Sequence, residues 1–333
     1  MTLTQLRYLI AIADSGLNIT TAAERVHATQ PGVSKQLKQL EDELGFQLFS
    51  RKGKSLHAIT PAGEQVLLRA RHIVTEAANI RAIAADLRGD EEGELAISTT
   101  HTQARFVLPN AIAALKQRYP RVGVHLKPEG DAQVMGAFER GQADLAIVST
   151  SEQAPESGLA VPLFRWRRVL VVPRGHALAG LGRRITFADL AQHPLVSYES
   201  SLRAESSLRK AFAAAGETPH FAFTSRDADL IKTYVRVGLG AGILAEMALL
   251  PEDSRDLVAL DAGELFAPCT TWIVLRRDRV PRGYALALAE LIAPQLDRRD
   301  LQRALAGEAP ERWPEPPDWA DLAAKTSAVV RVA

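Results

Sequence analysis

The chain has 333 residues, 47% of them hydrophobic and 24% charged, with a mean hydropathy of -0.05. This composition is typical of a soluble globular protein of two or three domains and excludes fibrous and disordered classes. Forty basic and 39 acidic side chains give a net charge of +1, which neither indicates nor excludes a nucleic-acid partner. The single Cys269 excludes an intramolecular disulfide, and we find neither a signal-peptide pattern nor a membrane span. We therefore expect a cytoplasmic protein.

Three short helices are predicted at the start of the chain. Apolar residues at i, i+3 and i+4 spacing predict the first helix over 3–13. A second helix is predicted from Thr20 or Thr21 to Val26, opened by a capping box of Thr21 and Glu24. In the third, Thr29 can cap the N-terminus and Pro31 occupies the first turn.

The third helix has an apolar face and a polar face. Val33, Leu37, Leu40 and Leu44 point inward, and the opposite side carries Gln30, Ser34, Lys35 and Lys38. A short helix pair with such a polar second helix is typical of a helix-turn-helix, which reads bases in the major groove. An ordinary solvated helix face is the alternative, and the pattern alone leaves both open.

Two short strands are predicted after the third helix, one near 46–49 and one over 56–61. They are joined by the basic turn Arg51, Lys52, Gly53 and Lys54. A basic turn beside a helix-turn-helix is typical of a wing that adds phosphate contacts.

A seven-residue repeat follows, from residue 63 to residue 87. Large apolar residues recur at Val66, Ile73, Ile80 and Leu87, with small ones at Gly63, Ala70, Ala77 and Ala84. This pattern predicts a long linker helix that self-associates along one seam. The alternative is a helix that packs only on its own domain.

Strands and helices alternate in the remainder, which predicts an α/β domain with parallel sheets. The strands are expected over 94–99, 122–127, 144–148, 168–172, 195–198, 221–223, 243–245, 257–260 and 272–275. The helices are expected over 105–119, 131–140, 206–215, 227–237 and 284–292. About 200 residues without a dominant break suggest two similar subdomains with a ligand cleft between them.

Polar residues end the first of these strands. Ser98 to Gln103 supply hydroxyl and amide groups just before a predicted helix N-terminus, and Ser149 and Thr150 end another strand. Such groups suit a small anion. We expect neutral donors, in preference to a buried cation, to hold it. Simple helix capping is the alternative.

Enzyme signatures are missing from the sequence. The glycines from Gly238 to Gly242 follow a helix and lack the full dinucleotide-binding spacing, so a tight turn is favoured. His101 lacks a neighbouring carboxylate in the local sequence to orient it as a base, and the eight histidines are scattered. We expect no enzyme activity, no cofactor and no metal site.

The chain resembles LysR-type transcriptional regulators over nearly its whole length. The N-terminal signature is carried by Ala22 to Glu24, Thr29 to Gln36, Leu40 to Gly45, Leu48 to Arg51 and Thr60 to Gly63. The C-terminal half is most similar to the CysB-like branch, which controls sulfur assimilation. Its matching runs are Thr99 to Arg105, Arg118 to Val122 and Asp227 to Arg236.

The resemblance implies a winged helix-turn-helix, a linker-helix dimer usually paired into tetramers, and a periplasmic-binding-protein-like effector domain. The implied effectors are an acetylated serine, sulfate or thiosulfate, and the implied partner is promoter DNA of sulfur-metabolism genes. A regulator of another pathway with another effector is the nearer alternative, and an α/β solute-binding protein or enzyme is the remote one. The DNA-binding candidates are Thr29, Gln30, Pro31, Ser34, Lys35, Lys38, Arg51 and Lys54. The effector-binding candidates are Thr99, Thr100, Thr102, Gln103, Ser149 and Arg203.

One departure affects the expected ligand. The branch usually has a Thr-Gly-Arg-Ser-like turn after the strand at 195–198, whereas this chain reads Glu199 to Ser206 and includes Arg203. The expected domains are 1–60 for DNA binding, 61–89 for the linker, 90–303 for the effector and 304–333 as an irregular tail. Within the effector domain, 90–163 plus 268–303 and 164–267 form the expected subdomains.

Overall fold

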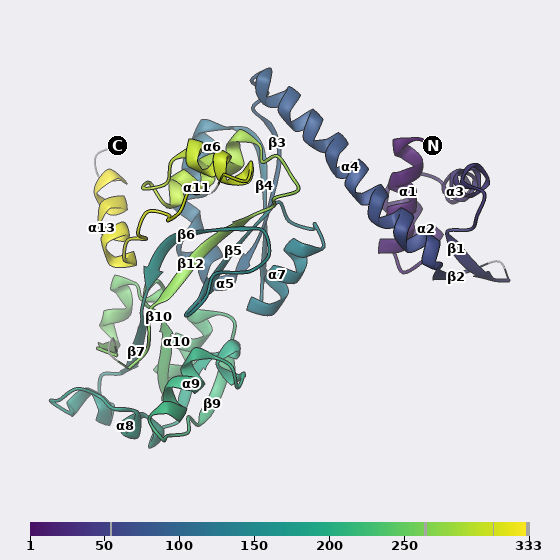
Figure 1. Cartoon of the computed structure of the whole chain (residues 1–333). Helices are drawn as coiled ribbons and strands as arrows, with labels where there is room; N and C mark the ends of the chain where they lie inside the picture. The colour runs from purple at the N-terminus through teal and green to yellow at the C-terminus, as the bar shows by residue number, and fades with distance from the viewer. Residues whose placement is uncertain (54, 263–264, 309, 331–333) are drawn as a thin grey trace. The chain divides into compact units, whose positions relative to one another are not determined.

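The computed structural model describes residues 1–53, 55–262, 265–308 and 310–330, and the chain divides into two compact units (Figure 1). Unit 1 contains Met1–Gly89 with Asp278–Val280, and unit 2 contains Asp90–Arg277 with Pro281–Ala333. Each unit is built around its own hydrophobic clusters. No helix in the described part of the chain is both long and apolar enough to cross a membrane.

Unit 1 begins with three helices, α1 (Leu3–Asp14), α2 (Ile19–Arg25) and α3 (Gln30–Leu44). The predicted cap of α3 is confirmed, because Thr29 Oγ1 accepts a hydrogen bond from the Gly32 N–H at 3.3 Å. The predicted capping box at Thr21 is wrong. Asn18 is the N-cap of α2 and accepts from the Thr20 and Thr21 N–H groups, so Thr21 already lies inside the helix. The Asn18 side chain is a better cap because asparagine is among the preferred N-cap residues.

The wing of unit 1 is an antiparallel pair, β1 (Phe49–Lys52) and β2 (Ser55–Ile59). Phe49 is fully buried at the start of β1 and fixes the strand against the three helices. Arg51 and Lys52 therefore belong to β1, and the prediction that both lie in the turn is wrong. The predicted turn residue Lys54 lies outside the described residues.

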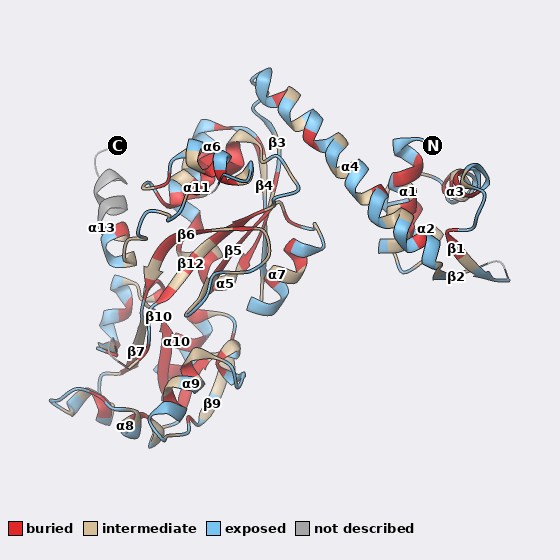
Figure 2. Ribbon diagram, viewed as in Figure 1, coloured by how far each residue is buried: buried red, intermediate tan, exposed pale blue. Residues whose placement is uncertain are grey.

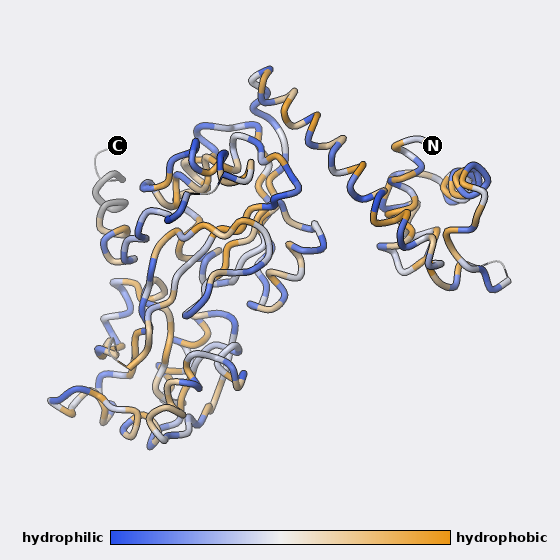
Figure 3. The backbone as a smooth tube through the Cα atoms, in the orientation of Figure 1, coloured by the Kyte–Doolittle hydropathy of each residue, from blue (hydrophilic) through white to orange (hydrophobic). Residues whose placement is uncertain are grey.

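The linker helix α4 (Pro61–Leu87) has two different halves. In the first half, Gly63 packs so closely on the residues before β1 that a Cβ there would lie 2.1 Å from the Leu48 carbonyl oxygen, and Ala70 is 1% exposed. Further along, Ile73, Ile80 and Leu87 are 42%, 63% and 83% exposed. Figures 2 and 3 show this half as largely exposed helix with hydrophobic positions recurring along it. Only the second half of the predicted seam is available to a partner.

The first sheet of unit 2 has the order β4-β3-β5-β12-β6. Its strands are β3 (Glu92–Thr100), β4 (Arg121–Glu129), β5 (Leu145–Thr150), β6 (Leu159–Trp166) and β12 (Cys269–Leu275). The strands β4, β3 and β5 are parallel, while β12 runs antiparallel to β5 and β6. One face is covered by α6 (Leu108–Arg118), α11 (Gly283–Ile292) and α12 (Arg298–Leu305), and the other by α7 (Asp131–Glu139).

The second sheet has the order β11-β7-β10-β8-β9. Its strands are β7 (Arg168–Pro173), β8 (Leu195–Tyr198), β9 (Phe221–Ser225), β10 (Ala241–Ala245) and β11 (Leu257–Leu260). The helices α8 (Phe187–Ala191) and α9 (Ser207–Ala214) contribute to one core cluster, and α10 (Ala228–Arg236) contributes to the other. Short 3₁₀ segments lie at Ala177–Gly180, Glu199–Leu202, Glu246–Ala248 and Pro251–Arg255. The expectation of parallel sheets is confirmed for the strands β4-β3-β5 and β10-β8-β9. It is wrong for the other pairs, which are antiparallel, so both sheets are mixed.

Two further segments differ from the sequence predictions. The helix expected over 105–119 is two helices, α5 (His101–Phe106) and α6, separated at Val107. The tail expected to be irregular contains α13 (Trp319–Val330), and Trp319 packs on Phe164 of β6 with ring centroids 5.1 Å apart. This aromatic contact supplies the apolar burial that a proline-rich tail lacks in its local sequence.

Candidate functional site

The polar row of α3 forms the exposed surface of unit 1 that the sequence predicts. Thr29, Gln30, Pro31, Lys35 and Lys38 are exposed, and Ser34 is half-buried. The orientation of the helix is fixed because Val33, Leu37 and Leu40 on its other side are at most 2% exposed. We call Gln30, Ser34, Lys35 and Lys38 the α3 surface.

A shallow hollow lies beside the α3 surface and includes the predicted residue Arg51. The Arg51 guanidinium pairs with Glu41 at 3.3 Å, and Glu41 also accepts hydrogen bonds from the Leu48 and Phe49 N–H groups. Glu41 thus joins α3 to the wing, and Arg51 is held by this joint. The sequence predicts a basic turn that contacts phosphates, and it does not predict this ion pair of Arg51 with Glu41.

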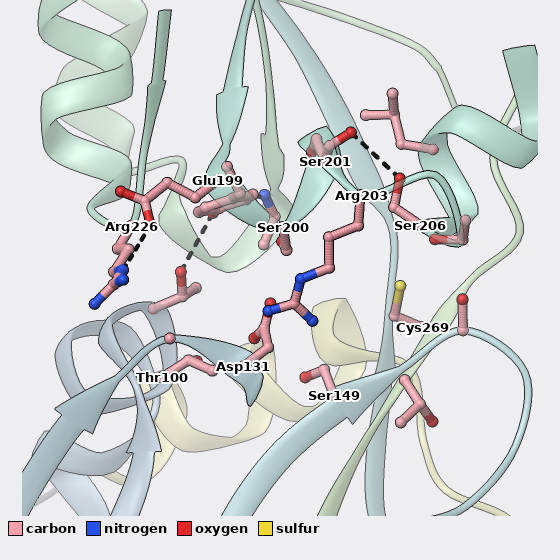
Figure 4. Close-up of a pocket in the computed structure, with 18 of the residues that line it drawn as sticks. Thr100, Asp131, Ser149, Glu199, Ser200, Ser201, Arg203, Ser206, Arg226 and Cys269 are labelled. Atoms are coloured by element: carbon pink, nitrogen blue, oxygen red, sulfur yellow. Dashed lines mark hydrogen bonds and ion pairs between the residues drawn. The ribbon is translucent and has the colours of Figure 1, made fainter. Parts of the chain in front are cut away.

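A cavity of about 690 Å³ lies in unit 2, lined by residues of both sheets (Figure 4). The C-terminal ends of β3, β4 and β5 supply one part of its wall, and the segment from Tyr198 to Lys210 supplies another. We call this the unit 2 cavity. Its lining includes the predicted residues Thr100, Thr102, Gln103, Ser149 and Arg203.

The described lining of the unit 2 cavity does not include Thr99. Successive residues of a strand point to opposite faces, and Thr99 is fully buried with its hydroxyl donating to the Ile147 carbonyl at 2.9 Å. Its role in this arrangement is to fasten β3 to β5. Thr100, one residue later, caps α5 by accepting from the Gln103 N–H at 3.5 Å.

Thr102 connects the two sheets. Its hydroxyl donates to the Tyr198 hydroxyl at 3.3 Å, and the Ala245 N–H donates to the same phenol oxygen at 3.2 Å. Burial raises the pKa of the Tyr198 phenol, although these hydrogen bonds oppose the shift. The phenol therefore stays neutral at physiological pH and works as a fixed polar link.

Ser149 lies at the centre of a hydrogen-bond cluster. Its Oγ lies 3.1 Å from Gln103 Nε2, 3.1 Å from Trp166 Nε1 and 2.9 Å from Thr271 Oγ1. The two nitrogens can only donate, so Ser149 accepts from both, and its single proton is directed to Thr271. In this arrangement Ser149 has no donor left for a ligand.

The Gln103 amide can present either its oxygen or its nitrogen to a ligand, depending on its orientation. Its Nε2 is shared between Ser149 and Thr271, while its Oε1 is buried with no partner. Rotating the amide by a half turn would direct Oε1 to the two hydroxyls and present Nε2 to the cavity. Gln103 is thus able to meet either a donor or an acceptor on a ligand.

The sequence analysis missed Arg168, which lines the unit 2 cavity from the start of β7. Its Nη2 donates to Ser207 Oγ at 2.7 Å, and its guanidinium lies 5.8 Å from the Trp166 ring and 5.7 Å from the Phe266 ring. Its Nη1 is buried with no partner. The cavity wall therefore contains a cation as well as the expected neutral donors, and the preference for neutral donors stays a prediction. The sequence did contain a signal for this residue. Trp166 and Arg168 lie where the chain is predicted to pass from one subdomain to the other, and residues at such a crossing are expected to line the cleft between the subdomains.

The cavity holds no activated nucleophile among its described residues. Burial raises the pKa of the Cys269 thiol, and Arg168 only partly opposes that shift. The thiol is therefore protonated at neutral pH, whereas the thiolate is the reactive form. Across the residues that the structure describes, no three His, Cys, Asp or Glu side chains are grouped to hold a metal ion.

Buried polar atoms without partners are concentrated among the residues that line the unit 2 cavity. Six such side-chain atoms occur among the described residues, and four belong to its lining. They are His101 Nδ1, Gln103 Oε1, Glu129 Oε2 and Arg168 Nη1. Unpaired buried polar atoms cost free energy, so a ligand that pairs them recovers that cost.

Arg203 enters the cavity from the segment that follows the 3₁₀ turn Glu199–Leu202. Figure 4 shows its side chain extending toward Asp131 and Ser149. The residue is exposed, so its position has little steric support. The arrangement places another guanidinium at the cavity in addition to those of Arg168 and Arg226.

Comparison with known proteins covers both units. The family model described as bacterial regulatory helix-turn-helix protein, lysR family, matches residues 3–64, and the LysR substrate binding domain matches residues 88–297. The chain is 39% identical to the HTH-type transcriptional regulator CysB of Haemophilus influenzae, covering 91% of this chain and 94% of that protein. It is 36% identical to the HTH-type transcriptional regulator SsuR of Burkholderia cenocepacia, covering 90% and 97%. The crystal structure of the cofactor-binding domain of the Cbl transcriptional regulator is 33% identical, covers 65% of this chain and 94% of that chain, and superposes with a TM-score of 0.59.

Proposed function

The chain belongs to the LysR family of DNA-binding transcriptional regulators, and on that premise we propose that a small anionic effector in the unit 2 cavity alters its operator binding. The observation that supports this most is the concentration of unpartnered buried polar atoms in that cavity. The genes it controls are those of sulfur metabolism, as the resemblance to the CysB-like branch implies. The protein acts in the cytoplasm.

DNA recognition is assigned to the α3 surface, together with Thr29 and Pro31 at the start of α3 and Arg51 of the wing. Thr29 is the N-cap of the helix and Pro31 lies in its first turn. Gln30 and Ser34 present amide and hydroxyl groups to base edges, while Lys35 and Lys38 neutralise phosphates. Footprinting on the native promoter tests this with a combined Gln30, Ser34 and Lys35 to alanine variant. Loss of the footprint supports the assignment, and an unchanged footprint contradicts it.

Effector binding is assigned to Thr100, Thr102, Gln103 and Arg203. Ser149 contributes by holding the Gln103 amide in position, and Thr99 holds β3 in place behind them. The candidate ligands are sulfate, thiosulfate and acetylserine. Thermal-shift titration of the full chain with each compound, followed by footprinting at saturation, tests the assignment. A compound that stabilises the chain and changes the footprint supports it, and the absence of either effect for all three compounds overturns it.

Self-association is assigned to the exposed half of α4, with pairs of dimers forming tetramers. Ile73, Ile80 and Leu87 are too exposed to be explained by packing within unit 1, and two half-sites on DNA require a dimer. Glutamate at both Ile73 and Ile80 should give monomers with little operator affinity. Light scattering that still shows the parent oligomer would contradict this assignment.

A second candidate function keeps the regulator and changes its signal to another sulfur source such as a sulfonate. The specific observation in its favour is Arg203, which extends into the cavity from a segment that replaces the branch's Thr-Gly-Arg-Ser-like turn. Calorimetry with wild type and Arg203→Ala separates the two. A preference among sulfur anions that disappears in the variant favours the second candidate.

A further inference from the structure

The unit 2 cavity carries more carboxylates than cations, which is unexpected for a simple anion site. Its described lining contains five acidic and four basic side chains. Two pairs compensate each other, since Glu152 pairs with Lys210 at 3.0 Å and Glu199 with Arg226 at 2.6 Å. The other charges are two arginines and three carboxylates. A divalent anion alone therefore meets little net attraction there.

One of these carboxylates, Glu129, has an unsatisfied buried oxygen. Glu129 ends β4 and is the register partner of Thr100 at the end of β3, so its backbone lies about 5 Å from that of an assigned effector residue. Its Oε2 is buried with no hydrogen-bond partner. A carboxylate oxygen can only accept. The group that satisfies it must bring a proton, and an ammonium also brings the opposite charge.

Arg168 lacks a hydrogen-bond acceptor for its Nη1, whereas Glu129 lacks a donor for its Oε2. The Arg168 Nη1 is buried with no partner, and a guanidinium can only donate. Ser207, Trp166 and Phe266 hold the group in place. The roles of Gln103 and His101 depend on amide orientation and tautomer. The roles of Glu129 and Arg168 do not, since the carboxylate can only accept and the guanidinium can only donate.

We propose that the effector is a small zwitterion, with an ammonium group that binds Glu129 and a carboxylate or sulfonate that binds Arg168. This inference rests on the proposed function for the assignment of an effector to this cavity, and it replaces the anion by a ligand that carries one positive and one negative group. Gln103 turns its amide to whichever ligand atom lies nearest, and the Ser149 cluster stays paired in both orientations. The ligand is small because the cavity volume is about 690 Å³ and is shared with the Arg203 side chain.

Matched ligand pairs test the ammonium requirement by calorimetry on the full chain. The first pair is 2-aminoethanesulfonate and 2-hydroxyethanesulfonate, which differ only in the ammonium group. The second is O-acetylserine and N-acetylserine, in which the amine is free or blocked. We expect the ammonium-bearing member of at least one pair to bind at least 10-fold more tightly. Equal binding within both pairs, tighter binding of the members without ammonium, or no binding of any of the four overturns the proposal.

A matched glutamate provides the control. Glu129→Gln should remove the preference by weakening only the ammonium-bearing member about 10-fold, while Glu152→Gln, whose carboxylate is already paired with Lys210, should change it less than 2-fold. A preference that survives Glu129→Gln in a folded variant also overturns the proposal. If Glu129→Gln does not fold, the wild-type preference decides the outcome.

The same experiment separates this proposal from the proposed function. Sulfate or thiosulfate that binds and changes the footprint, while no zwitterion does, would leave the proposed function intact and overturn the zwitterion. If none of the anions or zwitterions changes the footprint, the assignment of an effector to this cavity fails as well.

Discussion

The α3 surface and the unit 2 cavity use polar side chains in opposite ways. On α3, lysine, glutamine and serine side chains form one row along a single helix, and its lysines are exposed. In the cavity, Thr102 and Gln103 of α5 are 8% and 2% exposed, and they form hydrogen bonds with Tyr198 of β8 and Ser149 of β5. The comparison teaches that changes on α3 should affect DNA binding alone, whereas changes to buried polar groups of unit 2 should also affect folding.

The largest expected effect on stability concerns the buried ion pair between Lys232 of α10 and Asp253. The Lys232 Nζ lies 2.7 Å from Asp253 Oδ2 and 2.9 Å from the Ala248 carbonyl, and both charged residues are at most 3% exposed. Asp253→Asn removes the main counter-charge, and breaking a buried pair typically costs about 3–5 kcal/mol. Denaturant unfolding should show a loss of this order.

The exposed neighbour Asp256 is the control for that variant. Asp256 is 53% exposed at its side chain and pairs with the half-exposed Arg236. Asp256→Asn should cost at most about 1 kcal/mol, as for surface pairs. Similar losses in the two variants would show that burial does not distinguish them.

The same pair predicts a pH dependence. Burial alone would raise the pKa of Asp253, but hydrogen bonds from Lys232, the Leu250 N–H and Arg236 outweigh it and hold its pKa below the ordinary value. Because the folded pKa is the lower one, the stabilisation is complete above the unfolded pKa of about 4 and is lost as pH falls through the folded pKa. The difference in unfolding free energy between wild type and Asp253→Asn should be constant at pH 6–7 and shrink below about pH 4. A constant difference down to pH 3 would contradict this.

The sequence predicted well what depends on local periodicity. The α3 surface follows from a 3.6-residue repeat within one helix, and β8 and β11 follow from short apolar runs, so no distant contact was needed. A basic turn between two short apolar runs predicted the wing, and a seven-residue repeat predicted the linker helix. The division of α4 was not predictable, because the position of Leu48 against Gly63 is set by tertiary packing.

The cavity was harder to predict because its partners are far apart in the chain. Thr100, Thr102 and Gln103 were found from one strand end, and Arg203 from a departure in the family pattern. Thr271 is hydrogen-bonded to Gln103, which lies 168 residues away in the sequence. Arg168 is hydrogen-bonded to Ser207, which lies 39 residues away. Glu129 could not be predicted as a site residue, because its position beside Thr100 depends on the register of β3 and β4.

Gln103→Ala should give an intermediate effect on folding. The change removes the amide that bridges Ser149 and Thr271, whose hydroxyls then lose a buried donor. We expect about 1–3 kcal/mol of lost stability and weaker effector binding, with effector-free DNA binding intact. Urea unfolding and calorimetry measure the two effects. Gln133→Ala, which also lines the cavity, is the control, and an equal loss in both variants would show that the bridge contributes nothing specific.

Lys35→Ala should have the smallest effect on folding and a selective effect on DNA binding. Lys35 is exposed on α3, so the unfolding free energy should change by less than about 0.5 kcal/mol. Loss of one phosphate contact should lower the slope of log affinity against log salt by about 0.9 and weaken all sequences similarly. Gln30→Ala is the matched contrast, because it should relax base preference and keep the salt slope. Titrations of operator and scrambled DNA at several salt concentrations measure both quantities, and an unchanged slope in Lys35→Ala would remove this lysine from the interface.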